Sequence, residues 1–234
     1  MALNKEVFKT RSLTAVVFVI VMLAGLLWNR WSFVALFTII HFGCWYEFIK
    51  LIKKIHGEKY LPYCLLGLIY ITMPVLMLID LRSAWNDFEG AKKIEDLGAQ
   101  IPLLIIFSIW INDTMAYVVG SLIGKTPFSK ISPKKTWEGT LGGALLCVVV
   151  IGLLFRLVTD KWFYSLLPAA AYFIIPAICA IFGTAGDLLE SKIKRMADVK
   201  DSGSFMPGHG GFLDRFDSLL VATPFVWLYL TLFA

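Results

Sequence analysis

Long apolar runs separated by short polar segments constrain this chain more than any other feature of its sequence. The runs approach the roughly 20 residues that a helix needs to cross a bilayer. Hydrophobic residues make up 58% of the chain and charged residues 17%, against roughly 45–50% and about 25% in soluble domains. The runs lack the period-two alternation of membrane β-barrel strands. The sequence therefore predicts an all-α fold, a polytopic membrane helical bundle with about seven transmembrane helices. The predicted helices cover 13–28, 31–49, 61–79, 101–123, 138–158, 164–190 and 216–234.

The distribution of Lys and Arg predicts the orientation of this bundle. If the N-terminus lies inside and seven helices alternate, sixteen of the 22 Lys and Arg fall on the inner side, and a bias of this kind sets membrane topology. The same scatter of basic residues among short loops argues against a nucleic-acid partner, despite the net charge of +5. We expect a multi-pass protein of the cell (inner) membrane, with loops 124–137 and 191–215 facing the cytoplasm.

Polar residues interrupt the fourth apolar run. Asn112, Asp113 and Tyr117 follow each other at a spacing that places them on roughly one side of a helix. An ionisable residue inside a membrane segment usually faces a cavity or a partner. Either these side chains line a functional cavity, or Asp113 only pairs with a lysine to hold two helices together.

The loop that follows carries two lysines directly before a predicted helix. Lys134 and Lys135 precede Thr136, which we expect to be the N-cap of that helix. Free backbone N–H groups and the helix dipole favour phosphate at such a position. An alternative is a surface anchor that touches anionic lipid headgroups.

The sixth predicted helix ends in a periodic polar face. Asp187, Glu190, Ser191 and Lys194 stand at positions i, i+3, i+4 and i+7 and therefore share one face. Two carboxylates, a hydroxyl and an ammonium at the end of an apolar helix favour a site over a lipid-facing surface.

More charge and a glycine-rich turn follow in the same segment. Arg195 and Lys200 add positive charge, residues 207–211 read PGHGG, and Asp214 and Asp217 open the last helix. Mg²⁺ is typically held by one or two carboxylates together with substrate phosphates, and basic side chains neutralise the remaining phosphate oxygens. The alternative is a solvated charged loop. The sequence contains no HExxH, Ser-His-Asp or Walker A pattern.

The run from Ser191 to Asp217 resembles the signature of the phosphatidate cytidylyltransferases, also called CDP-diacylglycerol synthases. The upstream stretches NDTMAYVVG and SPKKTWEG resemble internal motifs of that family, so the similarity covers residues 112–218. The positions that carry the signature are Ser191, Lys194, Arg195, Lys200, Asp201, Pro207, His209, Gly210, Gly211, Asp214, Arg215 and Asp217.

The resemblance implies that CTP and phosphatidate give CDP-diacylglycerol and pyrophosphate, with Mg²⁺ and room for a second cation. It also implies a homodimer in the lipid bilayer. We expect one integral membrane domain over 1–234, with N-terminal helices in 1–100 and a catalytic half in 101–234.

The resemblance and the positions of these residues in the sequence suggest a role for each of them, which we state as hypotheses. We expect Asp187 and Asp214 to hold the metal and to form the catalytic set with Lys194. The expected substrate-binding set is Asn112, Asp113, Tyr117, Lys134, Lys135, Ser191, Arg195, Lys200, Asp201, His209, Gly210, Gly211, Arg215 and Asp217.

Two competing functions use the same features. A CTP-dependent polyprenol or phytol kinase would share the membrane setting and CTP but not the full signature. An ion-coupled transporter would use Asp113 and Asp187 as ion ligands, but transporters tend to show paired broken helices in two related halves.

Overall fold

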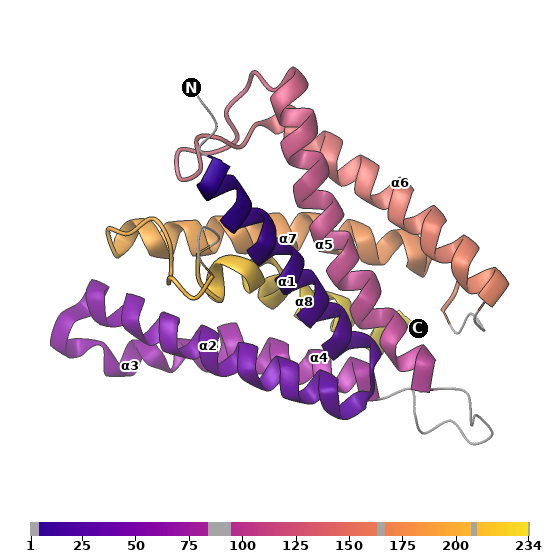
Figure 1. Ribbon diagram of the computed structural model, residues 1–234, viewed down its shortest axis with the longest axis horizontal. Helices are drawn as coiled ribbons and strands as arrows, with labels where there is room; N and C mark the ends of the chain where they lie inside the picture. Colours follow the sequence, from indigo (N-terminus) through magenta and orange to yellow (C-terminus); the bar gives the residue numbers. More distant parts are fainter. Residues whose placement is uncertain (1–4, 84–94, 163–166, 207–209, 234) are drawn as a thin grey trace.

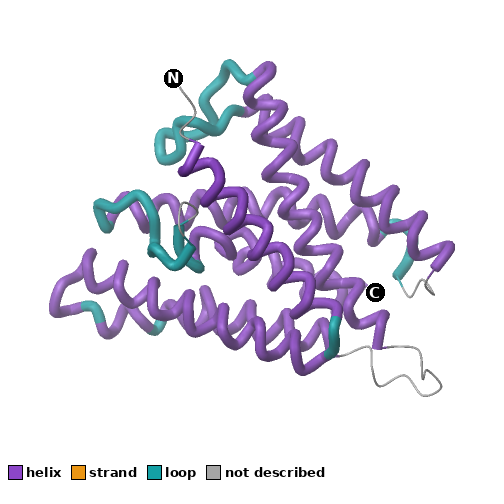
Figure 2. The backbone as a smooth tube through the Cα atoms, in the orientation of Figure 1, coloured by secondary structure: helices purple, strands orange, loops and turns teal. Residues whose placement is uncertain are grey.

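The computed structural model describes the backbone of residues 5–83, 95–162, 167–206 and 210–233. Within these ranges the chain consists of helices joined by short loops (Figures 1 and 2), which confirms the all-α prediction. The elements are α1 (Lys5–Leu27), α2 (Arg30–His56), the 3-10 turn η1 (Gly57–Lys59), α3 (Leu61–Cys64), the π-helical turn η2 (Leu68–Thr72), α4 (Met73–Ser83), α5 (Glu95–Ile123), α6 (Trp137–Trp162), α7 (Ala171–Met196) and α8 (Leu213–Phe233).

Six helical segments of the described residues are long and apolar enough to cross a membrane. They are Arg30–Lys59, Leu61–Ser83, Gly98–Ile123, Trp137–Val158, Ala171–Met196 and Leu213–Phe233. The predicted helix 13–28 corresponds to the shorter apolar stretch Ser12–Leu27 of α1. The protein is therefore a multi-pass membrane protein, with six helical segments of membrane-spanning length in the described residues.

Helices α2 and α7 extend furthest past the ends predicted from hydrophobicity. Helix α2 continues to His56 instead of 49, and α7 continues to Met196 instead of 190. Both extensions carry basic residues in the last turn, where positive charge interacts favourably with the helix dipole. Helix α7 also starts later than predicted, at Ala171, because residues 167–170 form a turn in which the Ala171 N–H donates to the Pro168 carbonyl at 2.8 Å.

Small residues allow the helices around the site to approach closely. A Cβ atom added at Gly143 of α6 would collide with Ala116 of α5, and one at Gly186 of α7 would collide with the backbone of Asp217 of α8. Such small-residue contacts are typical of helix packing in membranes. The close contact at Gly186 therefore places the polar end of α7 directly beside the polar start of α8.

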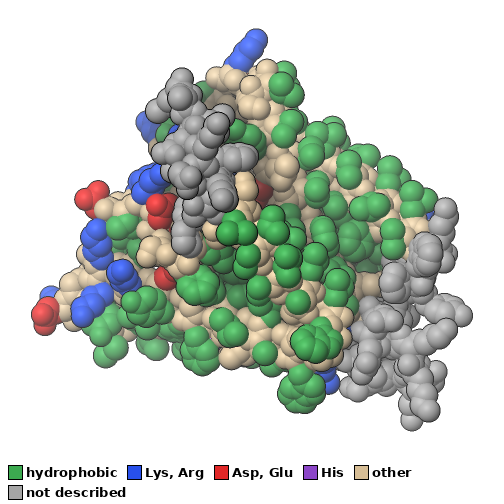
Figure 3. Space-filling model, viewed as in Figure 1, with side chains coloured by type: hydrophobic (Ala, Val, Ile, Leu, Met, Phe, Trp, Pro, Cys, Tyr) green, Lys and Arg blue, Asp and Glu red, His purple; other side chains and the backbone are tan. Residues whose placement is uncertain are grey.

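The basic loops gather at one end of the bundle. The start of α1, the α2–α3 turn, the α5–α6 loop and the α7–α8 loop lie on the same side in Figure 1, and α8 ends on the opposite side. Figure 3 shows charged side chains at this end and hydrophobic side chains over most of the remaining visible surface. The polar chemistry of the described chain is thus concentrated at one end of an apolar body.

Candidate active site

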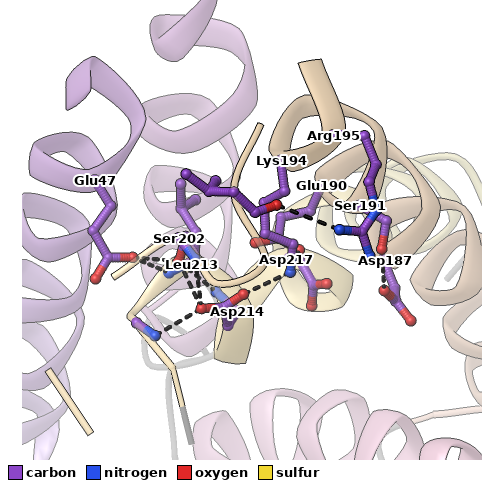
Figure 4. A network of polar contacts seen from close by, with 12 residues as sticks. Glu47, Asp187, Glu190, Ser191, Lys194, Arg195, Ser202, Leu213, Asp214 and Asp217 are labelled. Atoms are coloured by element: carbon purple, nitrogen blue, oxygen red, sulfur yellow. Dashed lines mark hydrogen bonds and ion pairs between the residues drawn. The ribbon is translucent and has the colours of Figure 1, made fainter. Parts of the chain in front are cut away.

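Three carboxylates converge where α7 and α8 meet. Asp187, Glu190 and Asp217 each offer an oxygen, and these oxygens lie within 4.8 Å of one another. Glu190 is 1% exposed and Asp217 8% exposed, while Asp187 is half-buried. Three acidic groups so close repel each other unless cations neutralise them. This cluster, called the acidic triad below, can hold a metal ion (Figure 4).

Two lysines pair with the acidic triad from different directions. Lys194, on α7, forms ion pairs with Glu190 and with Asp214, the latter at 2.6 Å. Lys135, in the α5–α6 loop, forms an ion pair with Asp187. The side chain of Lys194 is only 14% exposed, so its charge is little screened by solvent. The lysines place positive charge where phosphate groups would meet the carboxylates.

Asp214 has a different setting from Asp187. Its Oδ2 atom accepts hydrogen bonds from the N–H of Gly211 at 2.7 Å and from the N–H of Ser202 at 2.9 Å, and it lies 2.9 Å from the Ser202 hydroxyl oxygen. Its Oδ1 atom accepts from Lys194. The structure brings Asp187 together with Glu190 and Asp217, and it places Asp214 on Lys194 and the α7–α8 loop. The assignment of Asp187 and Asp214 as metal ligands stays a prediction.

A cavity of about 470 Å³ adjoins the acidic triad. Asp187 belongs to both, since it also lines the cavity with Asn112 and Asp113 of α5. The Oδ1 atom of Asn112 is buried without a hydrogen-bond partner among the described residues, so it is available to a ligand in the cavity. The other lining residues are Ala116, Tyr117, Gly120, Ser121, Ser132, Lys134, Lys135, Thr136, Thr140 and Thr184.

The start of α6 gives this cavity an anion-binding character. Thr136 accepts a hydrogen bond from the Gly139 N–H at 3.1 Å, which confirms the predicted N-cap, a contact worth about 1 kcal/mol in comparable helices. Lys134 and Lys135 precede the cap and line the same cavity. Positive side chains and a helix N-terminus together favour a phosphate group here.

Glu138 holds the loop that carries these lysines. Its carboxylate accepts from the Lys125 N–H at 3.1 Å, from the Thr126 N–H, and from the Thr126 hydroxyl at 2.7 Å. The Trp137 N–H also donates to the Thr126 carbonyl at 2.9 Å, and the rings of Phe128 and Trp137 meet edge to face. The loop therefore has a defined shape, held by the Glu138 carboxylate together with the Thr126–Trp137 backbone contact and the Phe128–Trp137 ring contact.

Under the activity that the family resemblance implies, Glu138→Gln is expected to raise the KM for CTP about tenfold and to lower kcat less, because the loop lysines would contribute mainly to binding of the substrate. A glutamine loses the charge-assisted acceptor that closes the loop. The measurement is steady-state kinetics at varied CTP, with Glu58→Gln, an exposed acidic residue of η1 at the same end of the bundle, as the matched control. An unchanged KM would show that the loop keeps its shape without Glu138.

The remaining predicted site residues lie at the edges of this arrangement. Ser191 donates to Asp187 at 3.3 Å, and Arg195 donates to the Val199 carbonyl at 3.5 Å. Lys200, Asp201 and Arg215 are exposed, the last at the start of α8. His209 lies outside the described residues.

Gly210 and Gly211 complete the turn before α8. Gly210 has φ +86°, a conformation that favours glycine, and a Cβ atom there would collide with the Asp214 carboxylate. The Gly211 N–H is one of the donors to that carboxylate. The two glycines therefore shape the turn around Asp214.

Two acidic residues of the site were not predicted from the sequence. Glu190 was placed on the polar helix face but not among the metal ligands, and Glu47 of α2 was not considered. Glu47 is 3% exposed and contacts the α7–α8 loop. The signal was present, because Glu47 is an ionisable residue within an apolar run, which marks a functional position.

Comparisons with known proteins place this chain in a family. A model described as the cytidylyltransferase family matches residues 88–233. The phosphatidate cytidylyltransferase of Bacillus subtilis (strain 168) is 36% identical over 185 residues, which are 79% of this chain and 63% of that protein. Phosphatidate cytidylyltransferase 5, chloroplastic, of Arabidopsis thaliana is 39% identical over 150 residues, 64% of this chain and 36% of that protein.

A third relative is similar over nearly its whole length. The phosphatidate cytidylyltransferase of Rickettsia felis (strain ATCC VR-1525 / URRWXCal2) is 31% identical over 228 residues, 96% of this chain and 92% of that protein. The chain spans less than two thirds of the Bacillus and Arabidopsis proteins. This chain belongs to the cytidylyltransferase family, which confirms the family predicted from the motifs.

Proposed function

We propose that this protein is a phosphatidate cytidylyltransferase of phospholipid biosynthesis, which converts CTP and phosphatidate into CDP-diacylglycerol and pyrophosphate. The observation that carries the proposal is the double position of Asp187, which belongs to the acidic triad and also lines the lysine-bearing cavity. Metal-binding oxygens and phosphate-binding cations meet at this residue. The family relatives described above carry the name of this activity.

The reaction requires charge neutralisation more than proton transfer. An ionised phosphate oxygen of phosphatidate forms a bond to the α-phosphorus of CTP, and the bond from that phosphorus to the bridging α–β oxygen breaks. Pyrophosphate leaves with the electron pair. Because the nucleophile is already ionised, the site needs cations that bring two anions together.

The acidic triad is suited to Mg²⁺, a hard cation that prefers carboxylate oxygens and substrate phosphates. We assign Asp187 and Asp217 to this ion, with Glu190 beside them, and give Asp214 the role of holding Lys194. The assignment of Asp214 as a ligand stays a prediction, which an Asp187→Asn, Asp214→Asn double variant tests. A bound Mg²⁺ would act as a Lewis acid on phosphate oxygens, and a second cation stays a prediction.

The chain's own cations have distinct places in this proposal. Lys135 approaches from the α5–α6 loop and binds phosphate at the cavity, next to Asp187. Lys194 approaches from the α7–α8 side and binds phosphate at the acidic triad. Asn112 presents its free acceptor to the amino group of a nucleotide base in the cavity.

We propose that the site faces the cytoplasm of the cell (inner) membrane, where CTP and Mg²⁺ are available. The gathering of basic loops at one end of the bundle supports this orientation (Figure 3). Labelling of single cysteines introduced at Lys130 and at Arg30 with an impermeant reagent, in intact and in permeabilised cells, tests it. The homodimer and the single domain over 1–234 stay predictions, and light scattering of the purified protein tests the former.

The test of the reaction uses purified protein in detergent with CTP, phosphatidate and Mg²⁺. Pyrophosphate release and a cytidine-labelled lipid are expected together, and both are expected to disappear when Mg²⁺ is chelated. Consumption of CTP with a polyprenol and release of CDP would instead identify a lipid kinase. Ion flux in liposomes without CTP turnover would identify a transporter.

A further inference from the structure

We infer that Glu47 of α2 is a positioning residue for the proposed reaction, which holds Lys194 against the acidic triad through Ser202 and Asp214. The inference rests on the proposed function and extends it, since it gives the N-terminal helices a part in the site. The matched family region begins at residue 88, well after Glu47.

Glu47 is a buried carboxylate bound by the first turn of α8. It accepts hydrogen bonds from the Phe212 and Leu213 N–H groups, both at 2.9 Å, and from the Ser202 hydroxyl at 2.7 Å. These three donors are neutral. A carboxylate at a helix N-terminus is stabilised by the free N–H groups and the helix dipole. Glu47 therefore fixes where α8 begins relative to α2.

A continuous set of contacts leads from Glu47 to the acidic triad (Figure 4). The Ser202 hydroxyl lies 2.7 Å from a Glu47 oxygen and 2.9 Å from the Oδ2 atom of Asp214. The other Asp214 oxygen accepts from Lys194 at 2.6 Å, and Lys194 pairs with Glu190 of the triad. The contacts from Glu47 to Lys194 join α2, the α7–α8 loop, α8 and α7 in turn, and the last pair lies within α7. The position of Lys194 therefore depends on how the loop packs on α2.

The loop is built around the Glu47 side chain. A Cβ atom added at Gly203 or at Gly211 would collide with the Glu47 carboxylate, and one at Gly43, one turn earlier in α2, would collide with the Phe212 ring. Farther along α2, Lys54 donates to the Asp198 carbonyl at 3.3 Å. One face of α2 thus contacts both ends of the loop between α7 and α8.

A glutamine cannot replace this carboxylate. Glu47 accepts from three donors, whereas the amide of glutamine has one acceptor oxygen and presents its NH₂ group to the remaining donors. At least one buried N–H would lose its partner, and the loop would shift to satisfy it. Glu47→Gln is therefore expected to lower kcat about 10- to 100-fold and to raise the Mg²⁺ concentration needed for half-maximal activity, as for residues that orient metal ligands.

The experiment compares Glu47→Gln, Ser202→Ala and the double variant in the full-length protein. Ser202→Ala removes the hydroxyl between the two carboxylates and leaves the α8 cap in place, so it is the milder test if Glu47→Gln folds poorly. The matched control is Phe37→Leu, which disturbs a fully buried side chain of α2 away from the loop. Measured are kcat, the Mg²⁺ dependence and the thermal unfolding midpoint.

The inference predicts that the double variant is no less active than the less active of the two single variants, since both substitutions act on one connection. It also predicts that Phe37→Leu lowers the unfolding midpoint but leaves kcat and the Mg²⁺ dependence unchanged. Wild-type kinetics in Ser202→Ala, multiplying losses in the double variant, or an equal loss of kcat in Phe37→Leu would each overturn it. A wild-type protein that forms no CDP-diacylglycerol would instead contradict the proposed function, and the inference with it.

Discussion

Asp187→Asn is expected to lower kcat by about a thousandfold, equivalent to ~4 kcal/mol of transition-state stabilisation. Asparagine keeps the size of the side chain but removes its negative charge, so the metal site loses a ligand and Lys135 loses its partner. Asp187 is the member of the acidic triad that also borders the cavity, so neither Glu190 nor Asp217 is placed to substitute for it. The measurement is initial-rate CDP-diacylglycerol synthesis at saturating CTP and phosphatidate over a range of Mg²⁺.

The matched control is Asp80→Asn. Asp80 is also a carboxylate within a membrane span. It accepts a hydrogen bond from Trp227 at 2.7 Å, and Trp227 lies about 15 Å along α8 from Asp217. Asp80→Asn should leave the rate unchanged. Asp217→Asn is expected to resemble Asp187→Asn, whereas Asp214→Asn should retain Mg²⁺ binding. An active Asp187→Asn, Asp214→Asn double variant would exclude the predicted metal pair.

Lys194→Gln is expected to lower kcat about a hundredfold, a smaller loss than that of a metal ligand. Lys194 is shared by Glu190 and Asp214 and is largely buried. Its removal withdraws a cation from the reacting phosphates and leaves two carboxylates without their counter-charge. Breaking a buried ion pair by removing one partner also costs about 3–5 kcal/mol of stability, so the unfolding midpoint should fall with the rate.

Lys192→Gln provides the comparison for Lys194. Lys192 is exposed and lies on another side of the same helix turn, so its variant should keep both rate and stability. Lys194→Arg keeps the charge but not the compact ammonium, and it should recover stability more than activity. A fully active Lys194→Gln would remove Lys194 from the catalytic set. It would also contradict the positioning role of Glu47, because that role acts through Lys194.

The fold was largely predictable because the bilayer restricts the choice of structure. Apolar runs at membrane length allow little besides helices, and the end of α5 and the starts of α6 and α8 fall near their predicted positions. The error at the end of α7 has a physical cause. Hydropathy marks where the hydrocarbon ends, but a helix such as α7 continues beyond it when its last turn carries basic residues.

The polar face of α7 was predictable for a related reason. Asp187, Glu190 and Lys194 follow helical periodicity, which the sequence displays directly. The choice between Asp214 and Asp217 was not predictable, because residues three apart on a helix share a face. Only the packing of Gly186 against the Asp217 backbone decides which of the two stands beside Asp187.

The role of Glu47 could not be deduced from spacing. Its partners are Ser202, Phe212 and Leu213, more than a hundred residues away, and no local pattern connects α2 with this loop. A rule that every acidic residue in an apolar run requires a partner would have marked the position. The identity of the partner is a property of the tertiary structure alone.

The cavity lies among membrane-spanning helices, with Asp113 and Tyr117 of α5 in its wall, and this location has a kinetic consequence under the proposed function. One substrate reaches the site by diffusion in the plane of the bilayer, and the other arrives from the aqueous volume. The rate should then follow the mole fraction of phosphatidate in the lipid phase. Added inert phospholipid would slow the enzyme at constant bulk phosphatidate. A larger volume of buffer at the same CTP concentration would not. The same protein is a two-dimensional catalyst for its lipid and a three-dimensional one for its nucleotide.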